Sequence, residues 1–343
     1  MTSERRREDS RPSLVSTFAT GLDNPRGLTF GPDGALYVAE GGRGGTISTS
    51  GRCPQIPGPI GRYTGGMTAR ISRLDSSGAY STVCDGLPSS RASATSGGAI
   101  SGVADVAFVG PQLYALVSGA GCSHGLADTA NGVYQVDPDG AWSVLADLGA
   151  FLREHVVARP DPADDEYDGT WYGVVAVGGA LYAVEPNHGE VDRISTDGSV
   201  ERLADISASE GHIVPTVIAH ADAFYVGNYG TFPRKPGSAK ILRITASGQV
   251  TEWAQGLSAV LGLAFDAEGR LYALENATAG GPALRAPASG RLVRVSPDGL
   301  DIVAAGLRSP TGVTIGSDGA AYISTFGFGP PGEGKIVRVQ LDH

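Results

Sequence analysis

The feature that most constrains this fold is a repeat whose last copy is one strand short. An apolar residue followed by tyrosine recurs within alternating apolar and polar residues at six positions: Tyr37, Tyr114, Tyr182, Tyr225, Tyr272 and Tyr322. Around each tyrosine the pattern predicts four short antiparallel strands, joined by glycine-ended turns such as "GPDG" and "SPDG". Repeats of about 45 residues with four strands are the sequence form of a β-propeller blade. The chain is therefore predicted to be all-β and to form a six-bladed β-propeller of four-stranded antiparallel blades.

The N-terminal segment carries the pattern that the last repeat lacks. The sixth repeat stops at His343 before its outer strand, whereas residues 14–22, "LVSTFATGL", match outer-strand segments such as "QVTEWAQGL". We expect residues 14–22 to pair with the C-terminal blade and to close the ring, because closure removes the exposed sheet edges. Residues 14–343 then form a single domain, and residues 1–13 are expected to be a disordered tail.

The composition excludes several classes of partner. The formal net charge of −10 opposes nucleic-acid binding, which needs clustered positive charge. No run of about 18 apolar residues could span a membrane, and no secretory signal is visible, so we expect a cytoplasmic protein that does not bind membranes. The pattern leaves the oligomeric state open. Cys53, Cys84 and Cys122 lack the spacing of a zinc site, and plain thiols are favoured over one bridge or a reactive thiol.

The long loops are predicted to share one face of the propeller. The connections from the first to the second strand and from the third to the fourth strand of each blade are tight turns, which places them together. The remaining connections must lie on the opposite face, and they include residues 41–68, 88–102, 119–131, 151–170 and 276–289. Function in such folds gathers where long loops are held by a rigid scaffold.

Oxygen-bearing side chains end the second strand of most blades. The position three residues after each anchor tyrosine is occupied by Glu40, Val117, Glu185, Asn228, Glu275 and Thr325. Glu40, Glu185, Asn228 and Glu275 could bind Ca²⁺ or another divalent cation, which prefers such oxygen ligands. Alternatively, Glu40, Glu185 or Glu275 could act as a catalytic acid or base, with His188 as a further candidate. The plainer alternative is that all are polar strand ends bonded to nearby backbone.

Other candidates could bind a substrate at the same face. Arg26 enters the first strand of its blade and could grip a carboxylate of a ligand, or it could pair with Asp23 or with a carboxylate of the next blade. Aromatic residues predicted on this face would suit a flat or apolar small molecule, unless they pack in the core: Trp171, Tyr172, Tyr229 and Phe326. The sequence has no glycine-rich loop before a helix, so no nucleotide or redox cofactor is expected.

Four phrases resemble a known family. They are "GLDNPRGLTFGPDGALYVAE", "GVADVAF", "VPTVIAHADAFYVGNYGTFP" and "SPTGVTIGSDGAAYIS", and together they are similar to the ScyD/ScyE family, which is named for scytonemin biosynthesis. The resemblance implies a six-bladed propeller, a link to secondary metabolism and relatedness in fold to NHL-repeat, gluconolactonase and strictosidine synthase propellers. Two features depart from the family: a secretory signal is absent, and Ala104 stands where members carry a channel histidine.

These observations together predict a small-molecule enzyme. We expect it to act at the long-loop mouth of the channel, as a hydrolase of esters or lactones or as a cyclase or condensing enzyme, through carboxylate or metal chemistry. The alternative is a non-catalytic propeller that binds a protein or ligand.

Overall fold

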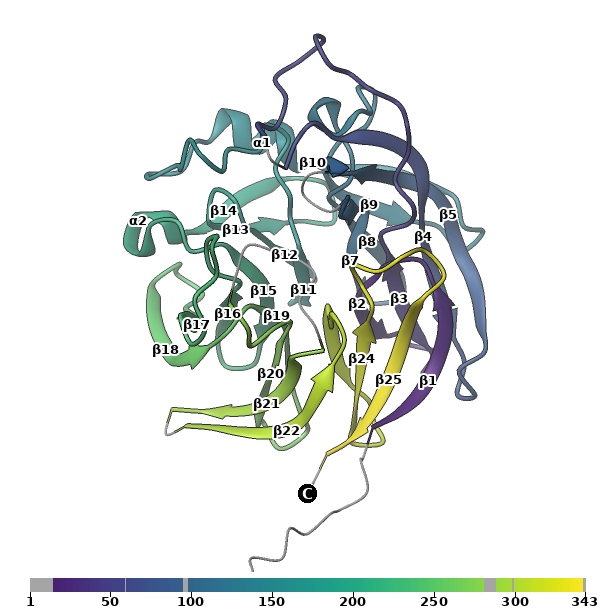
Figure 1. Cartoon of the computed structure of the whole chain (residues 1–343), viewed down its shortest axis with the longest axis vertical. Helices are drawn as coiled ribbons and strands as arrows, with labels where there is room; N and C mark the ends of the chain where they lie inside the picture. The colour runs from purple at the N-terminus through teal and green to yellow at the C-terminus, as the bar shows by residue number, and fades with distance from the viewer. Residues whose placement is uncertain (1–14, 59, 95–97, 281–287, 298, 342–343) are drawn as a thin grey trace, which may run out of the picture.

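The computed structural model confirms a six-bladed β-propeller (Figure 1). It describes residues 15–341 except 59, 95–97, 281–287 and 298. The predicted tail, Leu14, His343 and parts of three predicted long loops, 41–68, 88–102 and 276–289, therefore lie outside the described residues.

Blades 1 to 3 follow one another along the chain. Blade 1 contains β2 (Pro25–Phe30), β3 (Leu36–Glu40), β4 (Thr64–Leu74), β5 (Tyr80–Arg91) and the short β6 (Ile100–Ser101). Blade 2 contains β7 (Val103–Val109), β8 (Gln112–Val117), β9 (Gly132–Val136) and β10 (Trp142–Asp147). Blade 3 contains β11 (Gly173–Val177), β12 (Ala180–Glu185), β13 (Glu190–Ile194) and β14 (Val200–Asp205). The predicted 88–102 loop is thus partly strand, because β6 adds a fifth strand at the edge of blade 1.

Blades 4 to 6 complete the ring. Blade 4 contains β15 (Pro215–His220), β16 (Phe224–Asn228), β17 (Ala239–Ile244) and β18 (Val250–Leu257). Blade 5 contains β19 (Val260–Phe265), β20 (Leu271–Glu275), β21 (Gly290–Ser296) and β22 (Gly299–Leu307). Blade 6 contains β23 (Gly312–Ile315), β24 (Ala320–Thr325), β25 (Gly334–Gln340) and, as its outer strand, β1 (Val15–Leu22). Short helices α1 (Leu148–Glu154) and α2 (Ile206–Glu210) lie in the links after blades 2 and 3.

The N-terminal strand closes the ring as predicted. Strand β1 pairs with β25 in antiparallel register, from Val15 opposite Val339 to Leu22 opposite Gly334. Figure 1 shows the purple β1 beside the yellow β25. Sequence separation therefore does not prevent β1 from acting as an ordinary fourth strand.

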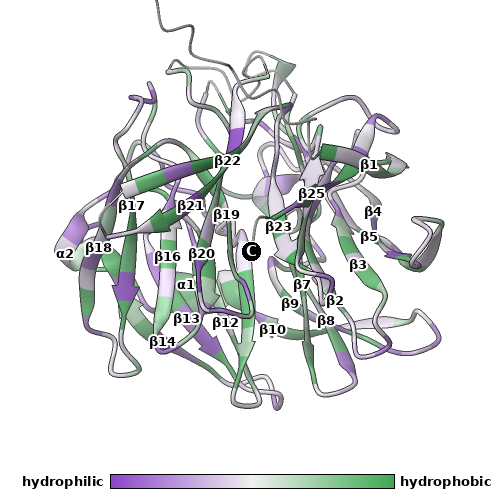
Figure 2. Ribbon diagram, turned by 90° about the horizontal axis from the view of Figure 1, so that it is seen from below, coloured by the Kyte–Doolittle hydropathy of each residue, from purple (hydrophilic) through white to green (hydrophobic). Residues whose placement is uncertain are grey.

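The core lies between the blades. Six clusters of buried apolar side chains each join one blade to the next, including the cluster of blades 6 and 1 around Leu22, Val38 and Ile336. Figure 2, coloured by the hydropathy of each residue, shows hydrophobic segments on the strands of the blades. Each sheet is covered on both faces by its neighbours, so the blades stabilise one another rather than folding as separate units.

The anchor tyrosine is held by an acid and an arginine. In blade 6 the Tyr322 hydroxyl donates to Asp318 at 3.0 Å, and Arg338 donates to the same carboxylate. Asp318 also accepts from the Ala320 N–H and so fixes the turn between β23 and β24. The same arrangement of tyrosine, aspartate and arginine occurs in blades 1 and 4. The recurring tyrosine therefore helps to hold the tight turn against the third strand of its blade.

Ring closure gives a stability prediction. Leu22 is fully buried in the cluster between blades 6 and 1, so Leu22→Ala should lower the free energy of unfolding by about 2–5 kcal/mol. The exposed Thr20→Ala on the same strand should change it by less than about 0.5 kcal/mol. Urea unfolding of both variants tests this prediction. Equal losses of unfolding free energy in the two variants would contradict the role of β1 in ring closure.

Candidate functional site

The predicted carboxylates at the ends of the second strands form hydrogen bonds that hold the scaffold together. Glu40 is fully buried and accepts hydrogen bonds from the Asp23 N–H, from Ser72 and from two guanidinium nitrogens of Arg70 at 2.8 and 2.9 Å. Asp23 lies in the segment that enters β2 of the same blade. Glu40 therefore ties the start of its blade to the second and third strands.

Side chains at the equivalent position make similar hydrogen bonds in blades 3, 4 and 5. Glu275 accepts from the Ser258 N–H at 2.6 Å and pairs with Arg291. Glu185 accepts from the Thr170 N–H at 3.0 Å and from the His188 N–H at 2.6 Å. In blade 4 the Asn228 side chain donates to the Ile213 carbonyl and accepts from the Lys240 N–H.

These contacts do not gather a metal site. Glu40, Glu185, Asn228 and Glu275 each bond within or beside their own blade, and their oxygens are occupied by backbone and cationic donors. Within the described residues, no group of three or more His, Cys, Asp or Glu could hold a metal ion. The four predicted ligands therefore do not fit a shared divalent cation, because a hard cation needs converging free oxygens.

Arg26, Tyr172 and Phe328 close the channel at its long-loop end. Arg26 is buried, donates to the carbonyls of Ile100 and Gly327, and stacks over Phe328 at 4.2 Å. It does not form the predicted pair with Asp23, whose carboxylate instead binds Arg43 at 2.9 Å. Tyr172 extends from blade 3 and donates to the Thr311 carbonyl of the opposite blade at 3.4 Å.

The other predicted aromatic residues lie in three different environments. Tyr229 is buried in an apolar cluster with Leu261 and the partly buried Tyr172 and Phe328, which adds to the closure. Trp171 is fully buried between blades 2 and 3, where it donates to Asp192 at 3.0 Å, so it is a core residue rather than a residue of the mouth. Phe326 is half-buried and has the Lys335 ammonium 5.2 Å from its ring centre. Of the predicted aromatic residues, Tyr172 alone borders the channel cavity.

The channel itself is the strongest candidate site. A cavity of about 400 Å³ is lined by the first strands of all six blades, with mostly aliphatic side chains. At its long-loop end the cavity is bounded by the buried Thr311 and Leu261. At the opposite end, on the tight-turn face, Phe30, Phe108 and Ile315 are only half-buried. The channel is thus closed on the long-loop face, where the sequence predicted the open mouth, and it faces solvent at the tight turns.

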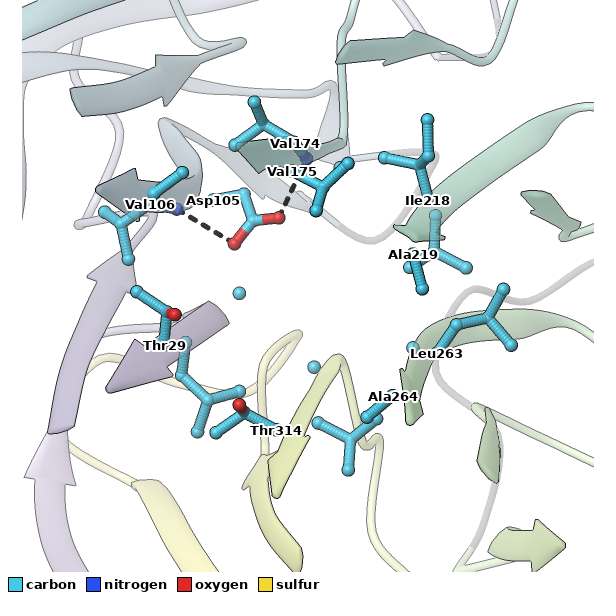
Figure 3. A pocket seen from close by; sticks show the side chains of 18 of the residues that line it. Thr29, Asp105, Val106, Val174, Val175, Ile218, Ala219, Leu263, Ala264 and Thr314 are labelled. Atoms are coloured by element: carbon cyan, nitrogen blue, oxygen red, sulfur yellow. Dashed lines mark hydrogen bonds between the residues drawn. The ribbon is translucent and has the colours of Figure 1, made fainter. Parts of the chain in front are cut away.

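Among the described residues, Asp105 is the one carboxylate in this lining. Figure 3 shows its side chain at the wall of the channel, among Val106, Val174 and Thr29. Its oxygens accept from the Val106 N–H at 2.8 Å and from the Val174 N–H of blade 3 at 2.9 Å. Burial raises the pKa of Asp105 to about 7, although both hydrogen bonds act in the opposite direction. The Asp105 carboxyl group thus joins blades 2 and 3 and has a pKa close to neutral pH.

Asp105 was not among the site residues predicted from the sequence. The available signal was a single acid within the otherwise apolar run "GVADVAF". A charged residue at an inward-facing position of an innermost strand is exceptional, since such positions are normally filled with apolar side chains.

Three histidines hold the acidic link between blades 2 and 3. Consecutive acids each face one of them: Asp164 lies 3.0 Å from His212, Asp165 lies 3.1 Å from His188, and Glu166 lies 3.4 Å from His124. The predicted catalytic His188 also contacts Glu185 at 3.2 Å, so both of its ring nitrogens face carboxylates. The Glu185 and Asp165 carboxylates outweigh burial and raise the pKa of His188 to about 9. His188 is therefore a cationic clamp at neutral pH and a poor general base.

A disulfide corrects the expectation for the cysteines. Cys53, in the long loop of blade 1, is bonded to Cys122, in the short turn η2 (Cys122–His124) of blade 2. Cys84 is a buried free thiol. The spacing of 69 residues gave no sequence signal, because the pairing depends on adjacent blades. Disulfides persist mainly in oxidising compartments, so this bond argues against the cytoplasmic expectation. No helix in the described ranges is long and apolar enough to cross a membrane.

Solved structures share the fold over nearly the whole chain. A streptogramin B lyase is 14% identical, with 96% of this chain and 97% of the other covered and a TM-score of 0.52. A putative gluconolactonase is 12% identical over 96% and 94%, with a TM-score of 0.52. A putative glucose dehydrogenase from Thermus thermophilus is 17% identical over 95% and 99%, with a TM-score of 0.55. These neighbours share the propeller fold. No protein-family model matches the chain, and no curated protein matches it.

The structural role of Glu40 predicts a loss of stability. Glu40→Gln should lower the free energy of unfolding by about 2 kcal/mol or more, because it removes a charged acceptor from Arg70 and the Asp23 N–H. Glu201→Gln removes the acid of an exposed arginine pair and should cost less than about 1 kcal/mol. Urea unfolding measures both free energies. If Glu40→Gln left the free energy of unfolding unchanged, the structural role of Glu40 would be refuted.

The clamp at His188 predicts a pH dependence. Because the pKa of His188 is higher in the folded protein than its usual value, its contribution is complete below about pH 6.5 and is lost as the pH rises through about 9. The difference in unfolding free energy between wild type and His188→Gln should shrink over that interval. The exposed His155→Gln is the control for loss of an imidazole. A difference that stays constant across the interval would contradict the clamp.

Proposed function

We propose that this propeller is a small-molecule enzyme that acts inside its central channel, with Asp105 as the acid and base. The observation that carries the proposal is a lone channel carboxyl group with a pKa of about 7 in a cavity of about 400 Å³. A general base is most effective when its pKa lies near the working pH. Perturbed carboxyl groups in clefts are also enriched at functional sites.

The chemistry that suits this arrangement is hydrolysis of an ester or lactone. The Asp105 carboxylate would take a proton from water as that water attacks the carbonyl carbon. The protonated Asp105 would then return the proton to the departing alkoxide. A cyclisation or condensation could use the same proton transfers, and the ScyD/ScyE resemblance points to a substrate from secondary metabolism.

The closed inner end sets the direction of entry and the shape of the substrate. Arg26, Tyr172 and Phe328 block the long-loop side, so a substrate would enter between the tight turns. The lining past Asp105 is aliphatic, with Val175, Ile218 and Leu263 around the channel (Figure 3). A slender substrate with one polar group fits this channel better than a highly charged one.

A non-catalytic propeller that binds a protein or ligand is the alternative. The observation that favours it is the long-loop face, where Glu40, Glu185 and Glu275 are all engaged in structural hydrogen bonds. Such a face offers a rigid surface rather than reactive groups.

Replacement of the channel acid separates the two functions. A panel of aliphatic and aromatic esters and lactones would be screened with wild type, and Asp105→Asn should lower kcat by at least about 100-fold. The wild-type rate should rise with pH through a group of pKa about 7, because the basic form is the carboxylate. Thr314→Val is the matched control, since it changes another polar residue of the lining and keeps the acid.

The opposite result would favour the alternative. Turnover that survives Asp105→Asn with an unchanged pH profile would remove Asp105 from the mechanism. Tight binding of a ligand with no turnover across the panel would support a binding propeller.

A further inference from the structure

A second cavity lies between blades 4 and 5, on the tight-turn side. It has a volume of about 380 Å³, within the range of small-molecule sites. Its lining comes from the tight-turn ends of β16, β20 and β21, from Trp253 of the outer strand β18, and from Phe265 at the end of β19. Phe265 lines both this cavity and the central channel, but the two sites are otherwise built from different residues.

Three aromatic rings form the apolar part of the cavity. The Tyr225 ring is met edge-on by Trp253 and by Phe265, each with a centroid distance of 5.2 Å. Tyr225 is buried, whereas Trp253 and Phe265 are half-buried and leave ring surface open. Rings so arranged bind flat aromatic molecules, because each offers a face or edge to a planar partner.

Most charged groups at the rim are held firmly by other groups of the protein. Asp222 accepts from Arg243 at 2.8 Å and from the Tyr225 hydroxyl at 2.9 Å. Arg270 donates to Asp266 at 2.5 Å and to Glu268 at 2.9 Å. Neither Asp222 nor Arg270 is therefore easily recruited by a ligand.

Arg294 differs because its ion pair is exposed. It donates to Asp301 at 2.7 Å, with side chains that are 42% and 70% exposed. Exposed pairs of this kind contribute little, because water screens them and both side chains lose freedom. A ligand carboxylate that is fixed by ring stacking can take the place of Asp301 and bind the guanidinium in two-point fashion.

We infer that the cavity between blades 4 and 5 binds a small carboxylate that carries a flat aromatic ring. Its ring lies against Trp253 and Phe265, and its carboxylate binds Arg294 in place of Asp301. This site is separate from the proposed chemistry at Asp105 and does not depend on it.

The probe for this site is phenylacetate, with its neutral isostere phenylacetamide. Titration calorimetry gives both affinities, and the indole N–H signal of Trp253 in heteronuclear NMR reports the place of binding. We expect saturable binding of phenylacetate that shifts the Trp253 signal, and weaker binding of phenylacetamide at the same place.

Two substitutions should act in opposite directions. Arg294→Gln should weaken phenylacetate about tenfold, or about 1.4 kcal/mol, and leave phenylacetamide unchanged. Asp301→Asn should tighten phenylacetate several-fold, because it removes the competing carboxylate. Trp253→Leu should weaken both probes.

The matched control is Arg73→Gln in blade 1. Arg73 faces Tyr37 as Arg294 faces Tyr272, and it pairs with Asp33, but it does not line the cavity. Arg73→Gln should leave both affinities unchanged. Absence of saturable phenylacetate binding, equal losses in Arg294→Gln and Arg73→Gln, or weaker binding in Asp301→Asn would each overturn the inference.

Discussion

The structure depends on the antiparallel pairing of β1 with β25. This pairing supplies the outer strand of blade 6 and brings Leu22 into the cluster between blades 6 and 1. Each blade relies on a neighbour to cover its apolar faces, so an unpaired end would expose one face and one edge. Closure also fixes six first strands around one axis, and the channel exists only because that circle is complete.

The buried acidic side chains differ in their surroundings, depending on where along the strands they lie. At the long-loop end, Glu40, Glu185 and Glu275 meet the backbone of the links and nearby cations, so burial is offset by hydrogen bonds. Asp105 accepts from two backbone N–H groups and is otherwise surrounded by aliphatic side chains, and burial raises its pKa despite both hydrogen bonds. The acids at the long-loop end are thus engaged in the scaffold, whereas the Asp105 carboxyl group borders the channel cavity.

The long-loop face is rigid because several links are tied to one another. The disulfide joins Cys53 of blade 1 to Cys122 of blade 2, and His124, two residues later, contacts Glu166 of the following link. Asp164 and Asp165 extend the same set of contacts to His212 and His188. The face that the loop lengths marked as functional is thus strongly cross-linked, and the open end of the channel lies on the other side.

Patterns within the chain were sufficient to predict the fold. The recurring tyrosine, the glycine-ended turns and the displaced outer strand of residues 14–22 specify six blades and their closure, because alternation and turn chemistry are local properties of the chain. The sequence also identified Glu40, Glu185 and Glu275 as a recurring set, without their partners. The three-dimensional arrangement was needed to show that Arg70 and Arg291 pair with two of them, that Cys53 bonds to Cys122, and that Tyr172 reaches across the channel to Thr311. The two arginine pairs depend on the register of adjacent strands within a blade, and the other two contacts depend on distances between blades. No local pattern encodes either quantity.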